Sequence, residues 1–238
     1  MKKILFQGDS ITDANRTQIL GQFPFGPAAS PPPPNEQARR MVEILQKTVL
    51  GTGYPTMVAG ELGCSVPGEY EVYNRAVSGA RIVDLYAQIK RDFINLQPDI
   101  ISILVGINDV AHEAAQRNGV DAAKFERVYE MLLSELKEAL PGVRFIIMEP
   151  YVLRGPISEK EWDFFVSETR LRAEASKRVA EKFGASFVPL QRELEEAAAT
   201  APEFWWSMDG VHPTAAGSGF IARRWLEVFH RDFTGGDK

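Results

Sequence analysis

The sequence predicts an α/β protein in which a parallel β-sheet lies between two layers of helices, a three-layer α/β/α sandwich. Five short runs rich in β-branched and aromatic residues recur along the chain, and segments with apolar residues three and four positions apart lie between and after them. Strands that alternate with helices form βαβ units, which build parallel sheets covered on both faces. The length of 238 residues suits a single domain over residues 1–238.

The predicted strands and the clearest helices follow one another in order. The strands are the runs at 3–7, 71–74, 99–105, 143–148 and 185–189. One helical stripe consists of Phe125, Val128, Leu132, Leu136 and Leu140, and another of Trp162, Phe165, Val166, Thr169, Ala173 and Val179. The last predicted helix opens with Pro213 at its first position and continues through Phe220, Ile221, Trp225 and Val228.

A proline-rich segment interrupts the alternation between the first and second strands. It is predicted as an inserted loop at about 22–36 with four prolines at 31–34, and an amphipathic segment follows near 39–50. Four consecutive prolines favour polyproline II structure and exclude a helix or a central strand. Two interpretations stay open, a loop that walls a cleft or packs on a neighbouring subunit, and a docking segment for a proline-binding partner.

Composition excludes several kinds of partner. The formal net charge of −5 repels nucleic-acid phosphates. Apolar stretches such as 100–105 are far shorter than the roughly 20 residues that cross a bilayer, so no membrane partner is expected. No signal-peptide core follows the basic first residues, and a cytoplasmic location is expected. Cys64 is the one cysteine of the sequence, which excludes an internal disulfide, and it is expected to be a small buried residue.

Small and polar residues follow three predicted strands, at the sheet edge where parallel sheets bind ligands. Ser10 follows the first strand, where its hydroxyl can face a cleft or cap a helix. Asn108 follows the third, where its amide can face the same cleft or satisfy loop backbone. Gly79 follows the second and by itself indicates only a turn.

A serine nucleophile needs a general base, and the chain has three histidines. His212 lies three residues after Asp209 and immediately before the last predicted helix. A carboxylate at this spacing can turn back to one ring nitrogen, fix its tautomer and stabilise the imidazolium. Ser10, His212 and Asp209 are therefore candidates for nucleophile, base and orienting carboxylate, while the alternative is a helix-capping turn with a surface histidine.

The other two histidines are weaker candidates for the base. His112 repeats the same spacing after Asp109, but Asp109 directly follows Asn108, and the two neighbours cannot readily serve an oxyanion and orient a base together. His112 is therefore interpreted as a loop or substrate-contact residue. His230 lies near the end of the last helix, where a positive charge is favourable.

Four blocks together resemble the SGNH/GDSL hydrolase superfamily. They are Gly8-Asp9-Ser10-Ile11, the block around Gly79, Gly106-Ile107-Asn108-Asp109 and Asp209-Gly210-Val211-His212-Pro213. The resemblance implies a flavodoxin-like five-stranded sheet of order 2-1-3-4-5, with Ser10 as nucleophile, His212 as general base and Asp209 as its orienter. It also implies an oxyanion hole formed by the N–H groups of Ser10 and Gly79 and the side-chain amide of Asn108, with no metal and no cofactor.

Within this superfamily the chain is most similar to intracellular acetylxylan esterases and related carbohydrate O-acetyl esterases, over 6–13, 50–54, 74–85, 98–110 and 209–217. The resemblance implies a serine esterase that acts on small-molecule or oligosaccharide esters such as acetylated xylo-oligosaccharides, and it is compatible with a homo-oligomer. A lysophospholipase or thioesterase of the same superfamily is one alternative. A non-catalytic glycan-binding relative is another.

Four further residues are expected near the substrate. Trp205 or Trp206 can offer a ring to a sugar, or both can belong to the core or a subunit interface. Arg81 can reach a substrate hydroxyl or pair with a surface carboxylate. Asp9, inside the first block, is also expected to line the substrate site.

Overall fold

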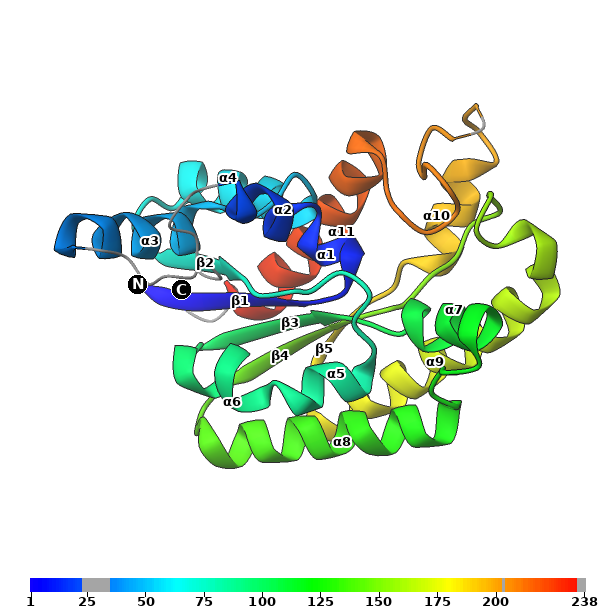
Figure 1. Cartoon of the computed structure of the whole chain (residues 1–238), viewed down its shortest axis with the longest axis horizontal. Coiled ribbons are helices and arrows are strands. Elements are labelled where there is room, and N and C mark those ends of the chain that lie inside the picture. Colours follow the sequence, from blue (N-terminus) through cyan, green and yellow to red (C-terminus); the bar gives the residue numbers. More distant parts are fainter. Residues whose placement is uncertain (23–34, 203, 235–238) are drawn as a thin grey trace.

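A computed structural model describes residues 1–22, 35–202 and 204–234. At its centre lies a five-stranded, all-parallel sheet of order β2-β1-β3-β4-β5 (Figure 1). The strands are β1 (Lys2–Gly8), β2 (Tyr70–Asn74), β3 (Ile100–Leu104), β4 (Arg144–Met148) and β5 (Ser186–Val188). The predicted sandwich and its strand order are confirmed, and each predicted strand agrees with the observed one to within one residue at each end.

Helices cover both faces of the sheet (Figure 1). On one face lie α1 (Ser10–Asp13), α2 (Arg16–Gly21), α3 (Glu36–Thr48), α4 (Tyr54–Ser65) and α11 (Ala215–Phe233). On the other lie α5 (Ile82–Ala87), α6 (Ile89–Asp92), α8 (Ala122–Ala139) and α9 (Trp162–Phe183). The helices α7 (Ile107–Gln116) and α10 (Gln191–Ala198) begin just after β3 and β5, and short 3₁₀ helices span Ile94–Leu96 and Glu159–Glu161.

The core consists of two apolar layers separated by the sheet. Ile4 and Phe6 of β1 pack with α4 and α11, whereas Leu5 between them packs with α5 and α8, because successive side chains of a strand point to opposite faces. Trp225 of α11 is fully buried in the first layer, where its ring stacks on Phe229 with centroids 4.8 Å apart. Burial on both faces holds the carboxyl ends of the strands in a fixed arrangement.

The last helix begins later than predicted. Pro213 is not its first residue, because the side chain of Thr214 caps α11 by accepting a hydrogen bond from the Gly217 N–H at 3.2 Å. Threonine is a favoured capping residue. Pro213 instead pairs with Ser207 in an isolated β-bridge, which closes the loop between them.

The prediction that Cys64 is buried is wrong, because its side chain is exposed. The buried face of α4 is formed by Tyr54, Val58 and Leu62, which are four residues apart. Cys64 lies two residues after Leu62, on the opposite side of the helix.

Helices flank the predicted insertion, α2 ending at Gly21 just before it and α3 beginning at Glu36, where it ends. The amphipathic segment predicted near 39–50 corresponds to α3, which begins earlier because the Asn35 side chain accepts a hydrogen bond from the Ala38 N–H at 2.9 Å. The prolines at 31–34 lie outside the described residues, so both interpretations of them stay predictions. Over 1–22, 35–202 and 204–234, no helix has the length and apolar composition that a membrane span needs.

Candidate active site

Ser10 lies at the carboxyl end of β1, as the first residue of α1. Gly8 ends the strand with a φ of +153°, and a Cβ there would collide with the Leu104 carbonyl oxygen of β3, so the position requires glycine. Asp9 caps α1 by accepting a hydrogen bond from the Ile11 N–H at 3.0 Å. Because Asp9 fills the capping role, the half-buried Ser10 hydroxyl is free to face the ligand-binding edge of the sheet.

The side chains of Ser10, His212 and Asp209 form one continuous chain of hydrogen bonds. Ser10 Oγ lies 2.8 Å from His212 Nε2, and His212 Nδ1 lies 2.7 Å from Asp209 Oδ2. When Nδ1 donates its hydrogen to the carboxylate, the lone pair of Nε2 faces the serine hydroxyl and can accept its proton. The arrangement suits a nucleophile, a general base and an orienting carboxylate.

The second oxygen of Asp209 is also fully engaged. Asp209 Oδ1 accepts hydrogen bonds from the backbone N–H groups of Val211 at 2.9 Å and His212 at 2.8 Å. Partial burial by itself would raise the pKa of Asp209, but the hydrogen bonds from the His212 backbone, the His212 ring and the Val211 backbone outweigh it and lower the pKa. Asp209 is therefore a carboxylate at neutral pH and can stabilise a protonated His212.

The loop that carries Asp209 and His212 rests on the segment that follows β4. Three hydrogen bonds join the two segments: Leu153 N–H to Gly210 O (2.8 Å), Ile157 N–H to Asp209 O (3.1 Å) and Tyr151 O–H to Val211 O (3.1 Å). The sequence does not predict this support, because most of the groups in these contacts belong to the backbone. The one signal is Gly155, where a Cβ would collide with the backbone of Asp209.

The two further oxyanion candidates lie on neighbouring segments. Gly79 has a φ of +82°, which favours glycine, and its N–H donates no hydrogen bond to another described residue. Asn108 lies in the first turn of α7, with Nδ2 3.3 Å from the Ala80 carbonyl oxygen. Ser78 beside Gly79 donates to Asp13 of α1 at 2.9 Å, which ties this turn to the helix that begins with the serine. Their roles as oxyanion donors stay predictions.

Asp9 does not line the substrate site, contrary to the sequence prediction. Its side chain has no exposed surface, Oδ1 accepts the Ile11 N–H, and Oδ2 is buried without a partner in the described part of the chain. Burial raises the pKa of Asp9 to about 7, although the Ile11 N–H and the nearby His212 act in the opposite direction. Asp9 supports the turn that presents Ser10.

We expect Asp9→Asn to stabilise the protein at high pH but not at low pH. A carboxyl group whose pKa is higher in the folded than in the unfolded chain favours folding when it is protonated. Below the unfolded-state pKa of about 3.9 the group is protonated in both states, and it costs no stability. As the pH rises above that value, the free energy of unfolding falls, and the loss is complete once the pH exceeds the folded-state pKa of about 7. The amide carries no charge and keeps an oxygen for the Ile11 N–H. Melting temperatures measured near pH 4 and pH 8.5 check this prediction, and an equal difference between variant and wild type at both would contradict it.

Arg81 makes its contacts within the protein. Its Nε donates to Asp84 Oδ2 at 2.9 Å, and its Nη1 donates to the Asn118 carbonyl oxygen at 2.6 Å. The first of these is the pairing with a carboxylate that the sequence left open. Together the two contacts leave the Arg81 guanidinium occupied by protein groups.

The two tryptophans differ in exposure. Trp206 is half-buried, with Nε1 donating to the Ala197 carbonyl oxygen at 3.0 Å and its ring edge-on to Phe220. Trp205 is 54% exposed and lies four residues before Asp209. Trp205 is therefore the ring that remains available to a ligand.

Neither of the other two histidines is placed to act as the general base. His112 lies on α7 and not in a loop, and the fully buried Asp109 carboxyl group accepts the Ile82 N–H in place of orienting a ring. His230 lies in the last turn of α11, where a positive charge is favourable.

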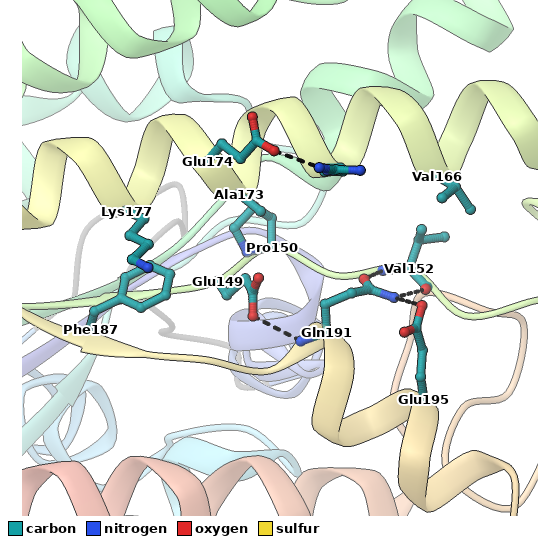
Figure 2. A pocket seen from close by; sticks show the side chains of 11 residues that line it. Glu149, Pro150, Val152, Val166, Ala173, Glu174, Lys177, Phe187, Gln191 and Glu195 are labelled. Atoms are coloured by element: carbon teal, nitrogen blue, oxygen red, sulfur yellow. Dashed lines mark hydrogen bonds and ion pairs between the residues drawn. The ribbon is translucent and has the colours of Figure 1, made fainter.

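A separate cavity of about 350 Å³ lies between α9 and α10, beside the carboxyl ends of β4 and β5 (Figure 2). Its polar groups mainly bond one another. Glu149 accepts the N–H groups of Leu190 and Gln191, and the Gln191 amide bonds both backbone groups of Val152 at 2.8 and 2.9 Å. The cavity wall thereby holds the segment that supports the loop of Asp209 and His212. None of the predicted catalytic residues lines this cavity, and in the part of the chain that the structure describes no group of three or more His, Cys, Asp or Glu side chains is arranged to hold a metal ion.

Comparisons with known proteins agree with this geometry. Residues 6–219 match the model of the GDSL-like Lipase/Acylhydrolase family. An acetylxylan esterase of Geobacillus stearothermophilus is 30% identical over 230 residues, which cover 94% of this chain and 92% of that protein. A crystal structure of an acetylxylan esterase from this organism has a TM-score of 0.74 at 28% identity, over 95% of this chain and 93% of its own.

Two further findings come from solved structures. A Parabacteroides merdae protein described as a GDSL-like lipase has a TM-score of 0.79 at 29% identity, over 95% of this chain and 94% of its own. Structures of the Geobacillus esterase described as catalytic mutants replace a serine, an aspartate and a histidine, the last two separated by three positions. These residue types and this spacing are the same as those of Ser10, Asp209 and His212.

Proposed function

The chain belongs to the GDSL-like Lipase/Acylhydrolase family and is a carboxylic ester hydrolase, and from this premise we propose that it is a serine esterase that removes acetyl groups from carbohydrate hydroxyls. One observation carries the proposal, the hydrogen-bonded chain from Ser10 Oγ through His212 to Asp209. An isolated serine hydroxyl is a weak nucleophile, and an adjacent base oriented by a third group is the arrangement that activates it.

The proposed reaction uses an acyl-enzyme. Ser10 Oγ attacks the ester carbonyl carbon while His212 Nε2 accepts the hydroxyl proton. The protonated ring then gives that proton to the sugar oxygen as its bond to the acyl carbon breaks, and the sugar leaves with a free hydroxyl. Water next attacks the acetyl-serine with His212 again as base, which releases acetate and restores Ser10. The N–H groups of Ser10 and Gly79 and the Asn108 amide are proposed to stabilise the tetrahedral oxyanion.

Two observations support a carbohydrate ester as the substrate. One relative is an acetylxylan esterase, and a structure from the same organism is described as an acetyl-xylooligosaccharide esterase. The exposed Trp205 ring lies four residues before Asp209, where it can stack on the apolar face of a sugar. The net charge of −5 does not oppose the binding of a neutral sugar ester.

A second candidate is a lysophospholipase or thioesterase that acts on longer acyl chains. Phe204, Trp205 and Met208 are all large, apolar and about half exposed, and they immediately precede the catalytic pair. Such a surface can also hold a hydrocarbon chain. The two candidates differ in the length of acyl group that they accept.

An acyl-length series distinguishes the two candidates. Initial rates are measured for 4-nitrophenyl acetate, butyrate and decanoate, together with acetate release from acetylated xylo-oligosaccharides, and Ser10→Ala serves as the blank. We expect the acetyl esters to have the highest kcat/KM and the oligosaccharides to release acetate. A preference for the decanoate without release of acetate from the oligosaccharides would favour the second candidate.

A further inference from the structure

The proposed oxyanion hole takes donors from two segments that must keep a fixed relative position. Gly79 lies in the turn between β2 and α5, and Asn108 lies in the first turn of α7. The Asn108 amide makes a single contact with this turn, 3.3 Å from the Ala80 carbonyl oxygen, which is at the upper end of N–H···O hydrogen-bond lengths. This contact alone is weak support for donors that must be preorganised.

Asp109, the residue after Asn108, reaches the other segment. Its side chain has no exposed surface, and its two carboxyl oxygens lie 3.2 and 3.3 Å from the Ile82 backbone nitrogen. Ile82 is the first residue of α5 and lies three residues after Gly79. Its N–H is one of the donors that a helix start leaves without an intrahelical partner. Asp109 thus holds the helix that begins just after the Gly79 turn.

Residues 118–120 reinforce the same connection through hydrogen bonds. The Asp109 carbonyl oxygen accepts the Val120 N–H at 3.0 Å, and Arg81 from the Gly79 turn donates to the Asn118 carbonyl oxygen at 2.6 Å. Arg172 of α9 is buried and donates to the Val120 carbonyl oxygen at 2.6 Å. Residues 118–120 are therefore tied to both sides of the proposed oxyanion hole.

We propose that Asp109 is a positioning residue for the oxyanion hole, which acts by holding Asn108 of α7 and the Gly79 turn in register. The proposal rests on the serine-esterase function given above. Asp109 does not touch substrate, since its side chain is fully buried. Its removal should loosen the donors and slow the chemical step while substrate binding stays nearly unchanged.

Burial disfavours the charged form of Asp109. Burial raises the pKa of Asp109 well above its usual range, against the opposing influence of the Ile82 N–H and of Arg172 and Arg81, and nearby Asp9 raises it further. A neutral asparagine has the same shape and keeps one oxygen for the Ile82 N–H. Asp109→Asn should therefore rescue the function that Asp109→Ala loses.

The first test compares kcat and KM for 4-nitrophenyl acetate in wild type, Asp109→Ala and Asp109→Asn. Leu133→Ala, a fully buried change in α8, serves as the control for destabilisation at a comparable loss of melting temperature. We expect Asp109→Ala to lower kcat by about 10-fold or more with KM within about twofold, a part of the 10²–10³ that loss of one oxyanion donor costs. Asp109→Asn and Leu133→Ala should stay within about threefold of wild type in kcat.

The second test asks whether Asp109 acts through Asn108. Asn108→Ala should lower kcat by about 10²–10³-fold, and adding Asp109→Ala should then cost less than the roughly 10-fold that it costs alone, because only the Gly79 donor is left for Asp109 to position and coupled residues are not additive. A double variant in which the two losses multiply would overturn the proposal. So would an Asp109→Ala enzyme that behaves like Leu133→Ala.

A substitution that removes the Ile82 N–H tests the proposal if Asp109→Ala does not fold. Ile82→Pro removes the N–H that Asp109 accepts, and proline suits the first position of a helix. Ile82→Ala truncates the same buried side chain but keeps the N–H. The proposal predicts a kcat about 10-fold lower for Ile82→Pro than for Ile82→Ala, and equal values would overturn it. An inactive wild type would overturn the proposed function and this inference together. If wild type is active and Ser10→Ala is inactive, the proposed function stands, and a failed prediction for the Asp109 or Ile82 variants overturns this inference alone.

Discussion

Ser10→Ala is expected to lower kcat/KM for 4-nitrophenyl acetate by roughly 10⁴–10⁶-fold with little change in melting temperature. The change removes the attacking oxygen, whereas the strand end, the Asp9 cap and the His212–Asp209 pair stay in place. The donors of the oxyanion hole also remain, so a small residual rate above that of water should persist. Steady-state kinetics and a thermal melt of the same sample measure both quantities.

Ser65→Ala is a matched control for this substitution. Ser65 is also a hydrogen-bonded serine, donating to Glu61 at 2.9 Å, but it lies exposed at the end of α4. Its kcat/KM should equal that of wild type. Wild-type activity in Ser10→Ala would show that another group attacks the ester.

His212→Ala is expected to cause a loss of similar size, and His112→Ala a change of less than about threefold. The Nε2 atom of His212 lies 2.8 Å from Ser10 Oγ, whereas the neighbouring Asp109 carboxyl group is turned toward the Ile82 N–H and does not orient His112. The same kinetic assay on both variants decides between the two histidines.

The double variant of Ser10 and His212 adds a second check. Because the two side chains act as one unit, Ser10→Ala combined with His212→Ala should be about as slow as either single variant. A large loss in His112→Ala with a small one in His212→Ala would contradict the assignment of the base.

The strands and the contacts that join Ser10, His212 and Asp209 could be predicted from the sequence for different reasons. Each strand is a short β-rich run bounded by turn residues, so the local sequence indicates where it begins and ends. Burial of the sheet on both faces reinforces these limits. The pairing of Ser10 with His212 spans 202 positions and has no local signal. It was predictable because both residues lie at the boundary of a predicted element and because the chain has only three histidines.

Other features depend on packing that no spacing encodes. Asp9 and Ser10 are adjacent polar residues, and only the turn after Gly8 decides that Asp9 is buried as the cap while Ser10 faces outward. Asp109 and His112 have the same spacing as Asp209 and His212, but the start of α5 lies beside Asp109 and presents the Ile82 N–H. The segment that supports the loop of Asp209 and His212 acts mainly through backbone groups, which every sequence has.

Covalent labelling with a fluorophosphonate tests the role of Ser10 most directly, because this reagent reacts with serine hydroxyls that an adjacent base activates. Intact mass and peptide mapping then locate the label. Wild type should carry one label per chain on Ser10, Ser10→Ala should carry none, and His212→Ala should react far more slowly. A label on another serine, or full hydrolytic activity in a protein whose Ser10 is labelled, would contradict the assignment of Ser10 as the nucleophile.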